Sequence, residues 1–396
     1  MSSPPYDVVN RDEAAAEIAC HAHSFMRVLR PEATLHGTVS TYADEVYDAA
    51  REALAELQAA GSLIREDGPC IYLYRQSWQG RQQIGVVCCC HVGDYETDII
   101  KKHEKTRKAK EDDRTRHVLA TDCNAGPVFL TYRDDDDVNQ LVDDDIAERP
   151  LFHFVDSGDV THTGWIARDA KPYVALFDAI PHAYVADGHH RSASAARAAA
   201  ALRRANPAHD GTEAYEWFLS VLFPASQLTI LPYNRTVADL HGHTPDEFLD
   251  RLRAVGLVTA VDGPTAPDTA GTFGVYVDGN WYALTLNADL IDESKPVDSL
   301  DCALLERHVL SPVLDIHDLR TDPRIGFVGG IRELLELQRR VDSGEAAAAF
   351  TLHAVTIEQL IKVADAGLCM PPKSTWFEPK LRSGLFIHQL DAPVQV

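Results

Sequence analysis

Residues 183–199, AYVADGHHRSASAARAA, bring a strand pattern, a turn pattern and a helix pattern together in one short stretch. The apolar run AYVA is typical of a buried strand, and the alanine-rich run that follows is typical of a helix. An aspartate, a glycine, two histidines and an arginine stand between them, at 187–191. The stretch therefore predicts a strand that feeds the N-terminus of a helix, in a fold of mixed α/β (α+β) class.

The predicted junction has the properties of a phosphate site. A helix N-terminus presents unpaired N–H groups and the positive end of the helix dipole. Gly188 lets the backbone approach a ligand closely, and Arg191 can donate two hydrogen bonds to one phosphate. His189 and His190 add donors that gain charge as a phosphate approaches. We therefore expect these four residues to bind phosphate.

Two other interpretations of the junction stay open. Adjacent histidines point about 100° apart on a helix, so His189 and His190 match a zinc site less well than histidines four positions apart. In a purely structural interpretation, Asp187 caps the helix and the histidines only pack. Other phosphate motifs are absent: no GxxxxGK[ST] loop occurs, PPKST at 371–375 lacks its glycines, and RIGFVGGIRELLELQ at 324–338 lacks the G-x-G-x-x-G spacing.

Composition limits the partners that the chain can have. The net charge is −23, with 37 Lys and Arg against 60 Asp and Glu, which disfavours nucleic acid and anionic membranes. No segment reaches the roughly 18 uninterrupted apolar residues of a membrane helix, and the first residues lack a signal pattern. We therefore expect a cytoplasmic protein that binds neither nucleic acid nor membrane.

Cysteines and lysines are unevenly placed along the chain. No CxxC pair occurs, and the three consecutive cysteines at 88–90 lie in the apolar run QIGVVCCCHV. They are expected to pack in a buried strand, with a metal or thiol role as the alternative. Of the ten lysines, five fall in KKHEKTRKAK at 101–110 and two in PPKSTWFEPK at 371–380. Both segments predict a local anion site, and a solvated helix face is the alternative for the first.

Residue patterns also predict the order of elements. Helices are expected at 12–28, 43–60, 99–119 and 357–366, strands at 70–76, 83–92, 128–133, 218–223, 228–235 and 273–286, a solvated acidic turn at 133–137, and mostly helix over 298–342. We expect residues 1–236 to form the catalytic domain with an N-terminal extension, 237–290 a small α/β insertion, and 291–396 a mostly helical C-terminal region.

Six motifs together resemble one family, a widespread bacterial and archaeal domain of unknown function. They are VADGHHR in the opening stretch, PPYDVVN at 4–10, DIIKKHEKTRKAKEDDR at 98–114, GPVFLTY at 126–132, LTILPYNR at 228–235 and MPPKSTWFEPKLRSGL at 370–385. The Asp-Gly-His-His-Arg element is similar to the signature of the ParB/sulfiredoxin superfamily. This resemblance implies a small α/β core that binds nucleotide phosphates, with an added C-terminal α/β region.

Three activities of that superfamily can be separated by residue. Sulfiredoxins carry a catalytic cysteine immediately before the His-Arg pair, where this chain has His189. ParB proteins add a helix-turn-helix domain, whereas this chain is acidic and shows no helical pair with a basic recognition face. Free serine kinases carry the Asp-Gly-His-His-Arg stretch and a His-Glu pair, which is similar to His103 and Glu104 here. The resemblance therefore implies a small-molecule kinase.

The kinase resemblance implies roles for individual residues. ATP or ADP would bind with Mg²⁺, L-serine is the favoured acceptor, and Glu104 would accept the proton of the acceptor hydroxyl. Asp187 and His190 join Glu104 as expected catalytic residues. Phosphate contacts are expected from Gly188, His189, His190 and Arg191, and substrate contacts from His103, Arg107, Lys380, Tyr6 and Asp7. The residue types themselves add Lys373, Ser374 and Thr375 as phosphate contacts, in a Pro-fixed loop that fits a closing lid and a structural clasp equally. The alternatives are a nucleotide-binding regulatory protein and a phosphatase or nucleotidase that uses the same phosphate site.

Overall fold

The fold was analysed on a computed structural model that describes residues 2–332 and 334–391. The predicted mixed α and β class is confirmed, because helices alternate with strands that form several sheets. The chain divides into two compact units. The first unit holds 1–102, 106–228 and 379–396, and the second holds 103–105 and 229–378. The expected division at 236 and 290 stays a prediction.

The first unit is built on an eight-stranded mixed sheet in the order β3-β8-β5-β9-β2-β1-β7-β6. Its strands are β1 (Tyr72–Trp78), β2 (Arg81–His91), β3 (Ile100–Lys101), β5 (Val128–Tyr132), β6 (Phe152–Val155), β7 (Thr161–Ile166), β8 (Ala183–Asp187) and β9 (Trp217–Pro224). A separate pair joins β4 (Cys123–Asn124) to β18 (His388–Gln389). Strand β8 runs parallel to β3 and antiparallel to β5, so its carboxyl end lies near one edge of the sheet.

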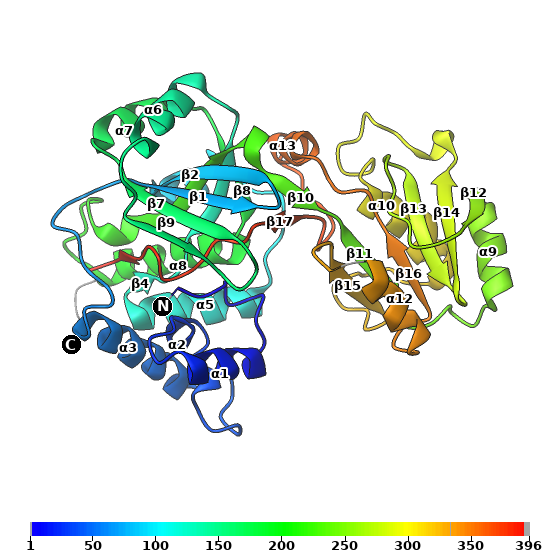
Figure 1. The fold of residues 1–396 in the computed structure, drawn as a ribbon, viewed down its shortest axis with the longest axis horizontal. Helices are drawn as coiled ribbons and strands as arrows, with labels where there is room; N and C mark the ends of the chain where they lie inside the picture. The colour runs from blue at the N-terminus through cyan, green and yellow to red at the C-terminus, as the bar shows by residue number, and fades with distance from the viewer. Residues whose placement is uncertain (1, 333, 392–396) are drawn as a thin grey trace. The chain divides into compact units, whose positions relative to one another are not determined.

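Helices cover both faces of this sheet. They are α1 (Arg11–Cys20), α2 (Met26–Leu29), α3 (Asp44–Ala59), α4 (Val92–Glu96), α5 (Lys108–Thr121), α6 (Asp136–Ile146), α7 (Ala170–Ala179) and α8 (His189–Ala205), with 3₁₀ turns η1 (Pro31–Ala33), η2 (Ala214–Glu216) and η3 (Ala225–Gln227). In Figure 1, α6 and α7 lie on one side of the sheet, and α5 and α8 lie on the other with α1 to α3 beyond α5.

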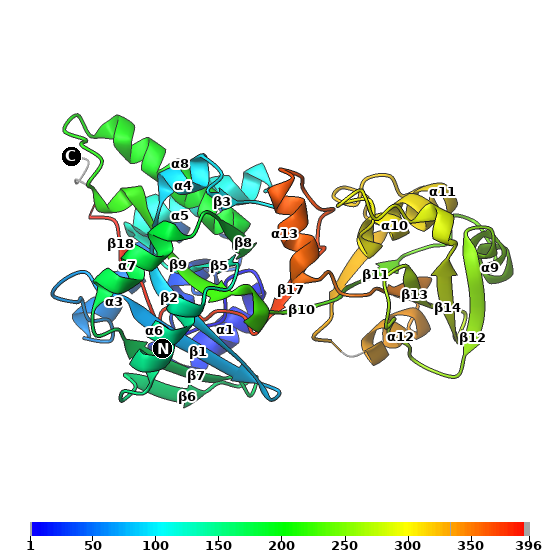
Figure 2. The same cartoon turned by 90° about the horizontal axis from the view of Figure 1, so that it is seen from above.

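The second unit contains a six-stranded antiparallel sheet in the order β12-β14-β13-β16-β11-β15. Its strands are β11 (Tyr233–Val237), β12 (Gly256–Val261), β13 (Thr272–Val277), β14 (Asn280–Leu286), β15 (Ile325–Gly329) and β16 (Ala348–Thr351). Strand β10 (Thr229–Leu231) pairs with β17 (Trp376–Glu378). The helical segments are α9 (Pro245–Arg253), η4 (Ala288–Leu290), α10 (Asp301–Leu305), the π-helical η5 (Glu306–Leu310), α11 (Ser311–Leu314), α12 (Leu334–Asp342) and α13 (Ile357–Asp365), seen from a second direction in Figure 2.

Several predicted elements are confirmed. The helix expected at 43–60 is α3, and the helix expected at 357–366 is α13. Strands β1 and β2 form the expected hairpin, with Tyr72 opposite Val87. The three cysteines lie in β2 as predicted, although each side chain is half-buried rather than fully buried.

Tertiary contacts override local pattern at 99–119 and at 12–28. The predicted helix at 99–119 is wrong over its first half, because residues 100–101 form β3 and bond to β8, and the helix begins only at Lys108. The predicted helix at 12–28 is also wrong, because α1 ends at Cys20 and a separate turn of helix, α2, follows.

One further prediction is wrong because a helix cap was missed, and another missed a strand. The acidic run at 133–137 is not a solvated turn, because the carboxylate of Asp135 accepts hydrogen bonds from the N–H groups of Asp137 and Val138 and caps α6. Acidic residues also favour a helix N-terminus through the helix dipole. The segment 298–342 is helical at 301–314 and at 334–342, as expected, with the unpredicted strand β15 between the two helical parts.

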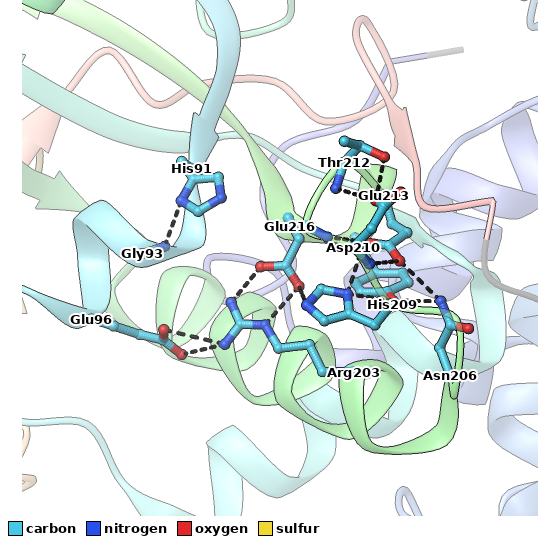
Figure 3. Close-up of polar contacts among 12 residues, drawn as sticks. His91, Gly93, Glu96, Arg203, Asn206, His209, Asp210, Thr212, Glu213 and Glu216 are labelled. Atoms are coloured by element: carbon cyan, nitrogen blue, oxygen red, sulfur yellow. Dashed lines mark hydrogen bonds and ion pairs between the residues drawn. The ribbon is translucent and has the colours of Figure 1, made fainter.

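The far end of α8 is held by a network of ion pairs, shown in Figure 3. Arg203, in the last turn, donates from Nε to Glu216 at 2.6 Å and from Nη1 to Glu96 at 3.3 Å. Glu216 is buried, with 3% of its side chain exposed. His209 lies between Glu213 and Glu216 in the same network. This network fixes the helix whose N-terminus carries the predicted phosphate residues.

Candidate phosphate site

The predicted turn between strand and helix is present in the first unit. Strand β8 ends at Asp187, Gly188 is the N-cap with φ +96°, and α8 begins at His189. A positive φ of this size favours glycine, and a Cβ atom at this position would lie 3.1 Å from Nε of Arg191. The pairing register between β8 and β5 shifts beside Asp187. Phe129 pairs with Asp187, but the next residue of β5, Leu130, pairs with Val185, so Ala186 of β8 is skipped. Such irregularities re-aim a side chain at the end of a strand.

Asp187 is the centre of a charged cluster at this turn. Its Oδ1 accepts the backbone N–H of Gly188 at 2.8 Å, and its Oδ2 lies 3.2 Å from Nζ of Lys380. Nη2 of Arg191 lies 3.9 Å from the same oxygen. Burial alone raises the pKa of Asp187, but the charges of Lys380 and Arg191 outweigh it and the pKa falls below its ordinary value. Asp187 is therefore an ionised carboxylate between two cations.

Arg191 is held rigidly at the start of α8. Its Nη1 donates to the carbonyl oxygen of Pro127, in the loop before β5, and 13% of its side chain is exposed. The rest of the guanidinium lies against Gly188. An arginine that is fixed in this way loses little entropy when it binds an anion.

The two histidines differ from each other. His189 is 7% exposed, and burial, with a smaller contribution from the charge of Arg191, lowers its pKa to about 4. His189 is therefore neutral near pH 7. The expected gain of charge as a phosphate approaches stays a prediction. His190 is half-buried, and its Nε2 accepts the backbone N–H of Arg107 at 3.1 Å. This bond ties the N-cap of α5 to the first turn of α8 and places the ring proton of neutral His190 on Nδ1.

The burial of His189 predicts a pH dependence of stability. In the unfolded chain His189 takes up a proton near its ordinary pKa of 6.5, whereas in the folded chain it stays neutral down to a pKa of about 4. The unfolded state thus binds more protons in this window, so the free energy of unfolding falls as the pH falls from 6.5 toward 4. Between pH 7.5 and pH 5, His189 is expected to lower the free energy of unfolding of the parent by about 2 kcal/mol. His189→Gln is expected to lack this part of the fall. Urea unfolding at both pH values tests this, and equal losses in variant and parent would contradict it.

Tyr6, Asp7 and Arg107 also lie in the first unit. Tyr6 is 8% exposed, and its ring lies beneath the guanidinium of Arg114 at 4.4 Å. Burial raises the pKa of Tyr6, so its hydroxyl keeps its proton. Asp7 is exposed to solvent. Tyr6 and Arg191 line one cavity, which places the PPYDV segment beside the helix of the phosphate motif.

His103 and Glu104 lie in the second unit. Residues 103–105 belong to the second unit, where the carbonyl oxygen of His103 accepts the backbone N–H of Met370 at 2.8 Å. The side chain of His103 is buried and that of Glu104 is half-buried. The His-Glu pair is therefore fixed by the start of the MPPKST segment.

The loop that carries Lys373, Ser374 and Thr375 lies in the second unit. Arg235 of β11 is fully buried, and its Nη2 donates to the carbonyl oxygen of Lys373 at 3.0 Å. Ser374 is buried and donates to the carbonyl oxygen of Pro371 at 2.7 Å. Lys373 is exposed and has φ +59°, and Thr375 is half-buried. In this conformation the Ser374 hydroxyl bonds within the loop, whereas the Lys373 side chain is exposed, with its Nζ 5.5 Å from the centre of the Tyr233 ring.

Mg²⁺ usually binds proteins through one or two carboxylates, with phosphates and water as its other ligands. Among the described residues, no group of three or more His, Cys, Asp or Glu side chains is arranged to hold a metal ion. Asp187 is the one carboxylate of the 187–191 turn. The turn therefore fits a metal that arrives with nucleotide phosphates and takes a single protein ligand. No helix in the described part of the chain has both the length and the apolar character to cross a membrane.

Sequence reasoning missed several residues around the turn. Pro127 holds Arg191 through its carbonyl oxygen, and Arg114, Asn124 and Ser383 line the cavity that Tyr6 and Arg191 share. Arg114 lies seven positions, about two helical turns, after Arg107, the N-cap of α5. Helical periodicity therefore places both arginines on one side of α5, and this is the sequence signal that could have found Arg114. No local pattern points to Asn124.

The chain was compared with known proteins. A sequence profile described as protein of unknown function, DUF1015, matches residues 1–303, whereas no curated protein matches the chain. Among solved structures, the chain is similar to a conserved hypothetical protein from Pyrococcus furiosus, with 14% identity, a TM-score of 0.37, and coverage of 75% of this chain and 93% of that one.

Two further solved structures are similar at the same level. A free serine kinase in complex with AMP shows 14% identity, a TM-score of 0.36, and coverage of 74% of this chain and 86% of that one. C-terminally truncated SbnI from Staphylococcus aureus shows 10% identity, a TM-score of 0.35, and coverage of 75% and 85%. Similarity at this level does not define an activity. The profile match spans most of the sequence, and the chain therefore belongs to the DUF1015 family.

Proposed function

We propose that this protein is a small-molecule kinase that transfers a phosphoryl group from ATP or ADP to the hydroxyl of a free amino acid, with L-serine as the favoured acceptor. The proposal includes a core of ParB/sulfiredoxin type. One observation carries it: Lys380 and Arg191 flank the single carboxylate Asp187 at the N-terminus of α8. Phosphoryl transfer needs positioned cations and N–H donors more than it needs covalent chemistry from the protein.

In this proposal the turn holds the donor phosphates. The N–H groups at the start of α8 and the guanidinium of Arg191 donate to phosphate oxygens. Lys380 supplies a second cation, and neutral His189 supplies a ring N–H group rather than charge. His190, whose Nε2 accepts from the N–H of Arg107, supplies the N–H of Nδ1. Mg²⁺, when bound with the nucleotide, would neutralise charge on the phosphates, and Asp187 is the residue that would hold it.

Glu104 is proposed as the general base that takes the proton of the acceptor hydroxyl. His103, Arg107, Lys380, Tyr6 and Asp7 are proposed as substrate contacts, and Lys373, Ser374 and Thr375 as further phosphate contacts. These assignments are supported by the resemblance of VADGHHR and KKHEKT to the motifs of free serine kinases. The exposed Lys373 side chain is available to an anion in solution.

Phosphorus NMR tests the proposed activity directly. The protein is incubated with Mg²⁺, ATP or ADP, and each of a panel of amino acids. A new phosphomonoester signal that requires L-serine is expected. Release of orthophosphate without transfer would instead identify a phosphatase or nucleotidase, and binding without any reaction would identify a regulatory protein; either result contradicts the kinase proposal.

Lys380→Met is predicted to weaken nucleotide binding about tenfold, because one charge-assisted contact to phosphate is lost. Fluorescence titration with a labelled ADP measures the affinity. Lys171→Met is the matched control, since Lys171 is exposed on α7 in the same unit. Equal affinities for Lys380→Met and Lys171→Met would remove Lys380 from the phosphate site.

A further inference from the structure

A small cavity lies in the first unit beside the charged turn. Its walls come from the N-terminal segment, α5, α8, β9 and the C-terminal segment, and most of them are apolar. It has about 40 Å³ of room for the centres of water-sized molecules, enough for a few waters or for one carboxylate group. The polar residues at its walls include Tyr6, Asn124, Ser383, Arg114 and Arg191.

Three of these side chains are more than nine-tenths buried and have donor groups left over. Tyr6, Asn124 and Ser383 are 8%, 7% and 2% exposed. The Asn124 carbonyl accepts the N–H of Leu219, but within residues 2–332 and 334–391 neither its amide nitrogen nor the hydroxyls of Tyr6 and Ser383 have a hydrogen-bond partner. These three donor atoms are not among the fully buried side-chain atoms that lack a partner in the described residues, so they open onto the cavity that their residues line. A ligand or water that accepts hydrogen bonds can satisfy them there.

The charges around the cavity favour an anion. Two guanidinium groups, Arg114 and Arg191, line its wall, and none of its lining residues is a carboxylate. Asp113 accepts from Nε of Arg114 at 2.9 Å, and Asp187 lies near Arg191, but neither carboxylate lines the cavity. Asp7 is exposed and does not line it either, although its charge raises the pKa of Tyr6. An anion in the cavity therefore meets two cationic side chains at its wall.

We propose that this cavity binds a small monocarboxylate and that, under the proposed kinase function on which this identification rests, the ligand is the carboxylate of the amino-acid acceptor. The carboxylate accepts hydrogen bonds from the hydroxyls of Tyr6 and Ser383 and from a guanidinium, while the apolar walls exclude a larger polar group. Arg191 then contacts both sides: its Nη1 end lies at the cavity and its Nε lies at the turn where phosphate is proposed to bind.

Isothermal titration of the full chain, without nucleotide, tests the cavity. L-Serine and glycine, which both carry the carboxylate, are expected to bind, and ethanolamine, which is serine without its carboxylate, is expected to give no heat. Tyr6→Phe is expected to weaken binding of both amino acids about tenfold. Gly126→Ala should weaken it at least as much, because the new methyl group would lie 2.7 Å from Oγ of Ser383 at the cavity wall. Tyr42→Phe, at an exposed tyrosine, is the control and should bind as the parent does.

The outcomes separate this inference from the kinase proposal. If serine and glycine give no heat, or if Tyr6→Phe and Gly126→Ala bind them as tightly as the parent, the carboxylate site is wrong even when phosphoserine forms. If both amino acids bind with the expected variant pattern and no phosphoserine forms, the carboxylate site stands and the kinase function fails. If orthophosphate binds with that variant pattern and glycine does not, the cavity is a phosphate site and this inference is wrong.

Discussion

Glu104→Gln is expected to lower the rate of phosphoryl transfer about 10²- to 10⁴-fold, the usual contribution of a general base. The amide has nearly the shape of the carboxylate but cannot accept the hydroxyl proton near pH 7. Nucleotide affinity should stay unchanged, because Glu104 is not among the proposed phosphate contacts. Single-turnover kinetics measures the transfer step, and titration with ADP measures the affinity.

The matched control for Glu104 is Glu52→Gln. Glu52 is an exposed carboxylate on α3, so its substitution makes the same chemical change at a position without a proposed role. A parent-like transfer rate in Glu104→Gln would exclude Glu104 as the base. A rate that falls together with nucleotide affinity would assign Glu104 to binding instead of proton transfer.

Arg203→Met is expected to lower the free energy of unfolding by about 3 kcal/mol, because it leaves the carboxylate of Glu216 buried without its main counter-charge. Arg203 bonds both oxygens of Glu216, and Glu216 has 3% of its side chain exposed. Methionine keeps much of the aliphatic packing of arginine, so the loss reports on charge. Urea unfolding followed by circular dichroism measures the change.

Arg204→Met provides the comparison for this effect. Arg204 is the next residue of α8 and is exposed, so the same substitution removes a positive charge from the same helix end without stranding a buried carboxylate. It is expected to change stability by less than about 0.5 kcal/mol. Equal effects of the two variants would show that the helix dipole, rather than the pair with Glu216, accounts for the loss.

The strand, turn and helix at 183–205 could be predicted because their causes are local. Apolar residues at 183–186 make a buried strand, and the alanines make a helix. Gly188 supplies the positive φ that the turn needs. The segment 99–107 could not be predicted in the same way. Its charged residues fit a helix face, but pairing of β3 with β8 satisfies the backbone of residues 100–101 in a strand.

Part of the candidate site was also accessible from sequence. The resemblance singled out Tyr6, Asp187, Arg191 and Lys380, which the first unit brings to one turn and the cavity beside it. The sequence did not show that burial lowers the pKa of His189 and keeps its ring neutral near pH 7. Burial depends on packing by residues far along the chain, so the charge state of a histidine cannot be deduced from its neighbours in sequence.

By itself, the sequence determined the strand-to-helix turn at 187–191, since backbone preference and helix propensity act over a few neighbouring residues. Only the tertiary structure decided that Lys380, 193 positions after Asp187, lies 3.2 Å from its carboxylate. It also decided that Arg114, Asn124 and Ser383 share a cavity with Tyr6. Lys380 and Ser383 reach these positions because the segment that begins at Pro379 belongs to the first unit. The packing energy that holds the segment there comes from contacts with residues far away in the sequence, which no local sequence pattern specifies.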